Sequence, residues 1–432
     1  MIRRTGAVAL AVSLVAWGAA AQGLPEADPE ELGFSAERLD RIETAFGAEI
    51  DRGRLPGAVI MVARDGQLAY SAALGQLDPE NGEAMADDAI FRIYSMTKPF
   101  TSVAALILME EGALQLVDPV AKFLPEFAEM EVVDGDDTEP AERAMTVQDL
   151  LRHTSGLAYG EITRNEVVRE GYAAAGAYNP DALPYDSRHV DPEEQVAGVA
   201  GTPLLHQPGT VFEYSFSTDI LGRVVEAVSG QRLGDFLDER LFGPLGMEDT
   251  GFHVPENALT RLAHPFEVDP ATGEPVPLMD VSERPENDSG GAGAVSTAAD
   301  YLRFAQMLAN GGELDGERIL SPTTVRLMAS DHLGDIDPGP GPSNLLLGTP
   351  GYGFGLGVMV REQDGIAAVP GAPGQFMWAG YGGTYFWVDP EESLVAVLMS
   401  ARSPERPYYR RHLMQLVYQA ITDEVEASPL MQ

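Results

Sequence analysis

The chain has 432 residues and no cysteine, so disulfide bonds, thiolate nucleophiles and cysteine metal ligands are excluded. Its 67 acidic residues outweigh 28 basic ones, and the resulting formal charge of −39 disfavours binding to nucleic acids and anionic membranes. Hydrophobic content of 44% with 8% aromatic residues is typical of a globular protein that has one large domain or two interlocked ones.

The first 21 residues have the pattern of a secretory signal peptide. Arg3 and Arg4 form a basic start, residues 5–17 are an apolar run, and residues 19–21 form an Ala-x-Ala cleavage site. The run is too short to span a bilayer, and no other segment is apolar enough. The pattern predicts an exported protein, periplasmic or secreted, without stable membrane insertion. An uncleaved N-terminal anchor is the alternative.

The pattern of the N-terminal part predicts a helix, a hairpin and a second helix, in that order. Ser35 can cap a helix that runs to about residue 51, because apolar residues recur at helical spacing after it. An Asp-Gly turn joins apolar runs at 57–63 and 68–70, which is a strong hairpin signal. A helix that is apolar nearly all round then runs from about residue 95 to 112, and it is expected to be buried.

The middle of the chain, residues 113–290, predicts mostly helix with many loops. Helical patterns cover 147–152, 219–228 and 233–241. Residues 161–202 have weak periodicity and are interpreted as a long loop or lid.

Strand signals return near the C-terminus. A helix is expected from residue 296 or 297 to 308, then strands over 352–360, 383–388 and 394–400, and a closing helix over 408–421. The few early strands cannot form a sheet of ordinary width alone, so they are expected to pair with the late ones.

This order predicts an α/β fold in which one domain is built from both chain ends. The expected domains are a signal peptide over 1–21, an α/β domain from 22–94 and 290–425, an inserted helical domain over 95–289, and a tail over 426–432.

The most informative local pattern is Ser95-Met96-Thr97-Lys98. Only two of the 28 basic residues are lysines, and an arginine cannot lose its proton whereas a desolvated lysine can act as a base. Three residues apart on a helix, Ser95 and Lys98 share a face, and a helix N-terminus favours an alkoxide. The pair predicts a nucleophile and its base. Chance would still produce it in about one chain in ten of this composition, so the surrounding motifs must decide.

Several segments that follow Ser95 in order complete the pattern. They are Asp118-Pro119-Val120, Leu150-Leu151-Arg152-His153-Thr154-Ser155-Gly156-Leu157 and Pro208-Gly209-Thr210-Val211-Phe212-Glu213-Tyr214-Ser215. With them, residues 30–425 resemble the serine β-lactamase and penicillin-binding-protein superfamily, and most of all its class C β-lactamase-type esterases, called family VIII carboxylesterases. The resemblance implies an antiparallel sheet flanked by helices, with a mostly helical domain inserted.

The resemblance also implies roles for individual residues. Ser95 would be the acylated nucleophile, Lys98 its partner, and Tyr214 the phenol that relays the proton. The backbone N–H groups of Ser95 and Tyr381 would form the oxyanion hole. Whether Lys98 or Tyr214 is the resting base is left open, because the two titrations are coupled.

Two departures from the superfamily bear on the substrate. Penicillin-directed members usually have asparagine two residues after the tyrosine, where this chain has Phe216. The usual Lys-Thr-Gly of the third motif is replaced by Trp378-Ala379-Gly380. Losing that lysine removes a cation that would pair with a carboxylate, so Phe216, Trp378, Ala379 and Gly380 are predicted to bind a less polar ester.

The sequence therefore predicts an exported serine hydrolase that cleaves carboxylic esters through an acyl-enzyme. Alternatives are an amide hydrolase on the same machinery (a β-lactamase, a D,D-peptidase, or a D-amino-acid peptidase or amidase) and a non-catalytic member that binds cell-wall fragments or proteins. A small-molecule ester or amide is the expected partner, and no cofactor or metal is expected. His153 and Lys122 are interpreted as structural and solvated residues, and the glycines of 290–293 as a loop beside the cleft.

Overall fold

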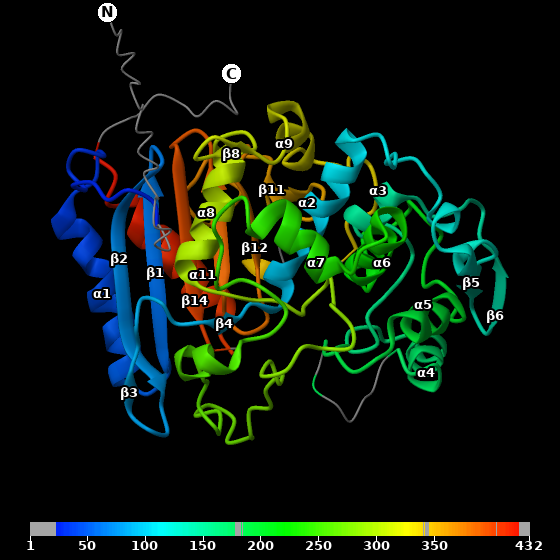
Figure 1. The fold of residues 1–432 in the computed structure, drawn as a ribbon, viewed down its shortest axis with the longest axis horizontal. Coiled ribbons are helices and arrows are strands. Elements are labelled where there is room, and N and C mark those ends of the chain that lie inside the picture. Colours follow the sequence, from blue (N-terminus) through cyan, green and yellow to red (C-terminus); the bar gives the residue numbers. More distant parts are fainter. Residues whose placement is uncertain are drawn as a thin grey trace, which may run out of the picture.

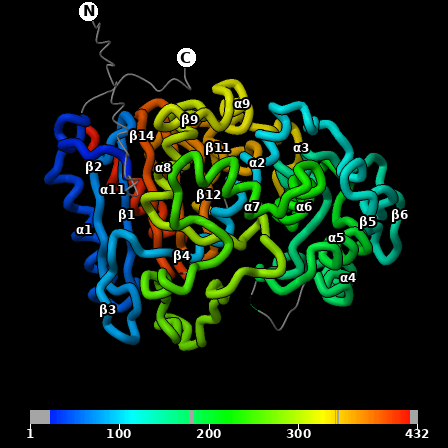
Figure 2. The backbone as a smooth tube through the Cα atoms, viewed as in Figure 1, coloured from blue at the N-terminus to red at the C-terminus, as the bar shows by residue number. Residues whose placement is uncertain are grey.

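The computed structural model describes residues 23–177, 183, 185–339, 341, 345–402 and 404–422. The predicted signal peptide and the predicted tail lie outside these residues. The backbone forms one continuous body in which the blue N-terminal and red C-terminal segments lie together at one side (Figure 2). Within the described residues, no helix combines the length and the apolar character needed to cross a membrane.

An eight-stranded sheet forms one half of the molecule. Its strands, in spatial order, are β10 (Tyr352–Phe354), β11 (Met359–Arg361), β12 (Phe376–Ala379), β13 (Tyr385–Asp389), β14 (Leu394–Ser400), β1 (Gly57–Arg64), β2 (Gln67–Asp78) and β3 (Glu83–Ala84). All neighbours are antiparallel, and β1 pairs with β14 from Ala58 opposite Ser400 to Arg64 opposite Leu394. The expected pairing of early with late strands is confirmed, as is the fold class.

The helices of the described residues pack on both faces of this sheet and form the other half of the molecule. They are α1 (Ala36–Asp51), α2 (Thr97–Glu110), α3 (Val147–Leu151), α4 (Glu166–Ala174), α5 (Pro192–Ala200), α6 (Ser217–Ser229), α7 (Leu233–Leu237), α8 (Ala298–Ala309), α9 (Pro322–Met328) and α11 (Arg406–Tyr418). Short strand pairs complete the structure: β4 (Phe91–Arg92) with β7 (Val295–Ser296), β5 (Glu131–Asp134) with β6 (Asp137–Pro140), and β8 (Glu313–Leu314) with β9 (Glu317–Arg318).

The alternation of side chains along β13 shows how both faces of the sheet are covered. The Phe386 ring lies 5.0 Å from that of Tyr301 on α8. On the opposite face, the Tyr385 hydroxyl donates to the sulfur of Met414 on α11, at 3.2 Å. Because successive strand residues point to opposite faces, α8 and α11 sandwich the sheet (Figure 1). All eight residues of β1 are buried as a result.

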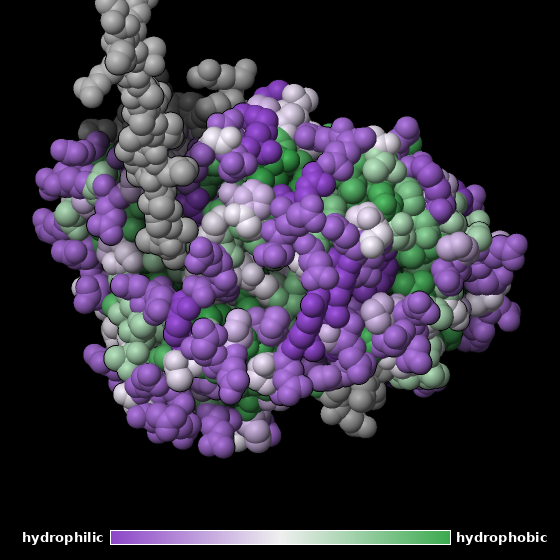
Figure 3. All heavy atoms as spheres, in the orientation of Figure 1, coloured by the Kyte–Doolittle hydropathy of each residue, from purple (hydrophilic) through white to green (hydrophobic). Residues whose placement is uncertain are grey.

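The helical half lies beyond α2 and α7, at the far side from α1 (Figure 1). Twelve of the fourteen residues of α2 are buried, as its nearly all-apolar pattern predicts. On the face shown in Figure 3, hydrophilic residues predominate, in keeping with the acidic composition.

Several sequence predictions about elements are corrected. Residues 161–202 are not one long loop, since they contain α4 and α5, which Asn165 and Asp191 cap through their side chains. The single strand expected over 352–360 is the antiparallel pair β10 and β11. The helix expected from Ser95 begins as the 3₁₀ turn η1 (Tyr94–Met96), and α2 follows it. The helical segment also contains the β5–β6 hairpin.

Candidate active site

Ser95 lies in η1, between the sheet and α2. The preceding residue, Tyr94, has a left-handed φ of 45°, which turns the chain sharply before the serine. Two hydrogen bonds hold the turn: Thr97 Oγ1 donates to the Tyr94 carbonyl at 2.6 Å, and the Tyr301 hydroxyl donates to the Met96 carbonyl at 2.9 Å. Tyr94 and Met96 are buried, whereas Ser95 is partly exposed. The turn therefore presents the serine side chain to a cavity.

Lys98 is fully buried in the first turn of α2. Its Nζ donates to the Gly291 carbonyl at 2.8 Å and to the Tyr159 hydroxyl at 3.1 Å, and lies 4.6 Å from the centre of the Tyr214 ring. Burial lowers the pKa of the Lys98 ammonium to about 7, although the nearby Asp219 carboxylate acts in the opposite direction. An appreciable share of this lysine is therefore a neutral amine near neutral pH.

Asp219, on the first turn of α6, fixes the surroundings of this amine. It accepts hydrogen bonds from Ser289 Oγ at 2.6 Å, from the Gly291 N–H at 3.2 Å and from the Tyr159 hydroxyl at 3.4 Å. The first two hold the loop whose carbonyl accepts from Lys98. A Cβ at Gly291 would clash with the Asp219 carboxylate, so the close approach requires glycine here.

Tyr214 lies against the same lysine. Burial raises the pKa of its phenol far above the usual value, while the neighbouring Ser95 and Trp378 side chains act in the opposite direction. Its buried hydroxyl has no hydrogen bond of normal geometry to any residue that the structure describes. The ring packs between His153 and Trp378, with centroid distances of 4.8 and 5.5 Å. The phenol is therefore neutral and available to a substrate.

The third motif lies on β12 and in the turn after it. Thr384 Oγ1 donates to the Ile93 carbonyl at 3.3 Å, which ties this turn to the segment before Ser95. A Cβ on Gly380 would clash with both the Ile93 carbonyl and Thr384 Oγ1. The Tyr381 N–H donates to no acceptor among the described residues. Glycine thus allows the two segments to touch, with a peptide N–H available beside them.

A cavity of about 90 Å³ joins these elements. It is lined by Ser95, Ile162, Tyr185, Tyr214, Leu345, Leu346, Trp378, Ala379, Gly380, Tyr381, Arg406 and Arg410. Aromatic and aliphatic side chains make up most of this wall, and the two arginines come from α11.

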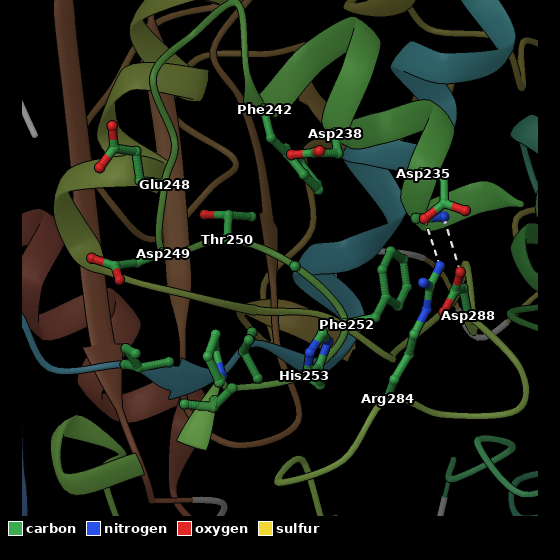
Figure 4. Close-up of a pocket in the computed structure, with 16 residues that line it drawn as sticks. Asp235, Asp238, Phe242, Glu248, Asp249, Thr250, Phe252, His253, Arg284 and Asp288 are labelled. Carbon is green, nitrogen blue, oxygen red and sulfur yellow. Dashed lines mark hydrogen bonds and ion pairs between the residues drawn. The ribbon is translucent and has the colours of Figure 1, made fainter. Parts of the chain in front are cut away.

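A second cavity, of about 250 Å³, lies between α7 and the loop over 248–255 (Figure 4). Several of its carboxylates form ion pairs with arginines. Asp235 pairs with Arg284 at 2.5 Å, and Asp288 pairs with Arg232 at 2.5 Å. It contains none of the residues predicted to react. Among the described residues, no group of three or more histidine, aspartate or glutamate side chains is arranged to hold a metal ion.

The structure brings most of the predicted site residues together. Ser95, Tyr214 and Tyr381 line the cavity with all three residues of the third motif, and Lys98 lies behind the wall. The prediction for Phe216 is corrected, because this residue does not line the cavity. Its buried ring packs on that of Tyr159, at a centroid distance of 4.7 Å. This position does not support the direct substrate contact predicted for it.

The residues that were not expected to react lie outside the cavity wall or support it. His153 is fully buried behind Tyr214, and burial lowers its pKa well below the usual value. Lys122 is half exposed and pairs with Asp118 at 2.8 Å, on the surface as expected. The glycine segment over 290–293 does more than line a cleft, because the Gly291 carbonyl binds Lys98.

Sequence reasoning missed Tyr159, Asp219 and Arg406. Tyr159 carries no motif signal, and Asp219 looks like an ordinary acidic residue in the first turn of a helix. Arg406 lies at the start of α11, more than 300 residues after Ser95, so no spacing rule could have placed it in this cavity.

Comparisons with known proteins agree with this geometry. Residues 39–419 match the family model described as Beta-lactamase. The chain is 32% identical to esterase EstB of Burkholderia gladioli, over 86% of this chain and 93% of that protein. It is 33% identical to penicillin-binding protein 4 of Amycolatopsis lactamdurans, over 85% of this chain and 91% of that protein. The chain belongs to the β-lactamase family.

Among solved structures, the fold is similar to that of EstCE1, described as a hydrolase with promiscuous acyltransferase activity. The TM-score is 0.75 at 29% identity, covering 90% of this chain and 99% of that one. Together with the esterases among the relatives, this confirms the predicted serine hydrolase of the β-lactamase family.

Proposed function

We propose that this member of the β-lactamase family is an exported carboxylesterase that works through an acyl-enzyme on Ser95. One observation carries the proposal: a fully buried lysine amine and a neutral phenol flank a partly exposed serine at a cavity lined mostly by aromatic and aliphatic side chains. A serine hydroxyl becomes nucleophilic when a base takes its proton, and an amine with a pKa of about 7 suits that task near neutral pH.

The opposite pKa shifts support one assignment of the resting protonation states. Burial lowers the pKa of Lys98 and raises that of Tyr214, so the neutral amine with the neutral phenol is the favoured pair. A phenolate at Tyr214 would need the shifts to run the other way. Lys98 is therefore the resting base and Tyr214 the proton relay.

The reaction then follows in two halves. Ser95 Oγ forms a bond to the ester carbonyl carbon as its proton passes to Lys98, and the N–H groups of Ser95 and Tyr381 stabilise the oxyanion. The carbon–oxygen bond of the ester breaks, and the leaving alkoxide takes the proton by way of Tyr214. Water then attacks the acyl carbon and gives up a proton to Lys98 and Tyr214. The bond between Ser95 Oγ and the acyl carbon breaks, that proton returns to Ser95 Oγ, and the acid leaves.

An ester is favoured over an amide by the residues at the third motif. Trp378 takes the place of the lysine that would hold a β-lactam or peptide carboxylate, and it is packed against Tyr214. EstB, a relative, is an esterase. An amide hydrolase is the second candidate, because penicillin-binding protein 4 is about equally similar.

The deciding experiment compares purified wild type with Ser95→Ala on 4-nitrophenyl esters, a chromogenic cephalosporin and a D-Ala-D-Ala peptide. We expect ester cleavage that depends on Ser95 and exceeds turnover of the other two. Faster Ser95-dependent cleavage of the cephalosporin would favour the amide hydrolase. Failure of a fluorophosphonate to label Ser95 would favour a non-catalytic binding protein.

Export rests on the N-terminal sequence pattern. Cell fractionation of the full chain tests it, with a variant lacking residues 2–21 as the control. We expect a mature form beginning at Gln22 outside the cytoplasm, and retention of the shortened variant inside.

A further inference from the structure

The peptide that joins Gly380 to Tyr381 carries one of the two N–H groups expected to stabilise the oxyanion. This N–H donates to no acceptor among the described residues, and both residues line the cavity that contains Ser95. An oxyanion donor contributes most when its direction is set before the substrate binds. The direction of this N–H depends on what holds the rest of its peptide.

The backbone around this N–H has little stiffness of its own. Residues 380–383 are Gly-Tyr-Gly-Gly, and Gly383 has a left-handed φ of 108°. Glycine restricts backbone angles least of all residues, so outside groups must restrain such a segment. The Tyr381 ring supplies one restraint, because it lies 5.6 Å from the Tyr94 ring and 5.5 Å from the Tyr185 ring. These ring contacts fix the side chain and leave the preceding peptide plane to other groups.

Arg410, on α11, holds the carbonyl of that same peptide. Its Nη2 donates to the Gly380 carbonyl oxygen at 2.8 Å, and the Gly383 N–H donates to the same oxygen at 3.3 Å. The peptide is planar and trans, so its N–H points away from the groups that its carbonyl faces. Fixing the carbonyl on Arg410 therefore fixes the direction of the Tyr381 N–H as well.

The charge of Arg410 acts on the peptide in addition to its geometry. The residue is 2% exposed, and its guanidinium also donates to the Leu346 carbonyl at 3.3 Å. Hydrogen bonds from an ionised donor are stronger than neutral ones, and linked hydrogen bonds polarise one another in a dry interior. A positive charge at the Gly380 carbonyl draws electron density from the N–H of the same peptide. That N–H becomes a better donor to an oxyanion.

We propose that Arg410 is a positioning residue that orients and polarises the Tyr381 N–H of the oxyanion hole through the Gly380 carbonyl. In this role it touches no reacting atom and gives up no proton. The inference rests on the proposed acyl-enzyme chemistry of Ser95 and adds the residue that prepares one of its two oxyanion donors. The next peptide is held in a similar way, since Arg406 donates to the Tyr381 carbonyl at 2.7 Å.

The test replaces by sulfur the carbonyl oxygen that the hole binds. Uncharged 4-nitrophenyl acetate is compared with O-4-nitrophenyl thionoacetate, whose C=S sulfur is larger and accepts N–H hydrogen bonds poorly. Arg410→Gln removes the charge and the reach of the guanidinium. We expect it to lower kcat/KM for the oxygen ester about 10- to 100-fold, less than the loss of about 100- to 1,000-fold that follows removal of an oxyanion donor. The thionoester should lose much less, so the ratio of the two kcat/KM values should fall.

This ratio separates positioning from structural damage. Both esters are measured on one preparation, so a smaller folded fraction lowers the two kcat/KM values equally and leaves their ratio unchanged. Arg411→Gln is the matched control, because this neighbour on α11 donates to the Leu347 carbonyl and does not line the cavity. Its ratio should stay at the wild-type value. Equal losses on both esters in Arg410→Gln, or no loss, would overturn the inference while leaving ester hydrolysis intact.

A binding measurement keeps the inference testable if no ester is cleaved. An aryl trifluoromethyl ketone adds to a reactive serine and forms a hemiketal oxyanion, and competition with fluorophosphonate labelling gives its affinity. Arg410→Gln should weaken the ketone about 10- to 100-fold and leave the corresponding alcohol, which cannot add to serine, unchanged. This selective loss would support the inference even if the protein hydrolyses amides. An unchanged ketone affinity would contradict it.

Discussion

Burial acts in opposite directions on the two titratable groups beside Ser95. An ammonium loses its hydration shell when it is enclosed, so its neutral form is favoured; a phenol is kept neutral for the same reason. Lys98 is fully buried, and Tyr214 is partly buried with its hydroxyl enclosed. One desolvated environment thus prepares a base and a proton donor side by side, and the nearby Asp219 limits how far the lysine pKa falls.

The pH dependence of the reaction should report the lysine. Below its pKa Lys98 is an ammonium and cannot accept the serine proton, so kcat/KM for a neutral ester should rise with pH to a plateau above about 7. Asp219→Asn removes the charge that raises this pKa, so the rising limb should move to lower pH. A limb that stays in place or moves to higher pH would show that Lys98 is not the group that titrates.

Exchanging each lysine for arginine separates charge from basicity. Lys98→Arg should abolish ester turnover while circular dichroism remains native, because arginine keeps its proton. Lys122→Arg is the matched control: its side chain is half exposed and pairs with Asp118, so activity should be unchanged. Retained turnover in Lys98→Arg would remove the lysine from the role of base.

At the scale of elements, the site is a junction between a strand and a turn. The turn after β12 touches the segment before Ser95, with Gly380 at the closest approach. The α11 helix, packed under the same sheet, adds Arg406 and Arg410 to the cavity wall. Each element contributes one part of the site, so the spacing between elements matters as much as their residues.

Adding one methyl group at this junction should disable the site. The Cβ of Gly380→Ala would clash with the Ile93 carbonyl and with Thr384 Oγ1, so β12 and η1 must separate. We expect a large loss of kcat and a loss of about 1–3 kcal/mol of unfolding free energy, measured in urea. Gly47→Ala is the control, because that α1 position has open space and alanine should stabilise the helix by about 0.5–1 kcal/mol. Native-like activity in Gly380→Ala would contradict this geometry.

At the scale of the whole molecule, antiparallel pairing of β1 with β14 joins the two chain ends into one sheet, and the net charge of −39 spreads over its surface. Like charges repel more strongly in the compact state than in the extended unfolded chain. The cavity is an exception to this surface, because its charged side chains are arginines.

Salt should therefore stabilise the fold. Raising ionic strength from about 0.01 M to about 1 M shortens the screening length from about 30 Å to about 3 Å and weakens the repulsion. Exposed ion pairs contribute little on their own, so their screening should not cancel the gain. We expect the thermal midpoint at pH 7 to rise with sodium chloride. A falling midpoint would mean that ion pairs outweigh the net repulsion.

Local patterns predicted the elements whose physics is local. The Ser35 cap of α1, the Asp-Gly turn between β1 and β2, and the buried face of α2 all depend on residues close in sequence. Predictions were wrong where tertiary contacts decide, as in α4 and α5, whose weak periodicity looked like a loop. Phe216 was misplaced because its position in the sequence does not reveal that its ring packs on Tyr159 and does not line the cavity.

The sequence by itself determined which residues are expected to react and their order along the chain: a rare lysine three residues after a serine, then Tyr214, then the third motif. Only the tertiary structure decided that Lys98 is fully buried, that Gly291 and Tyr159 bind its amine, and that two arginines line the same cavity. Desolvation and charge depend on what surrounds a group in space, and those surroundings come from segments up to about 300 residues apart.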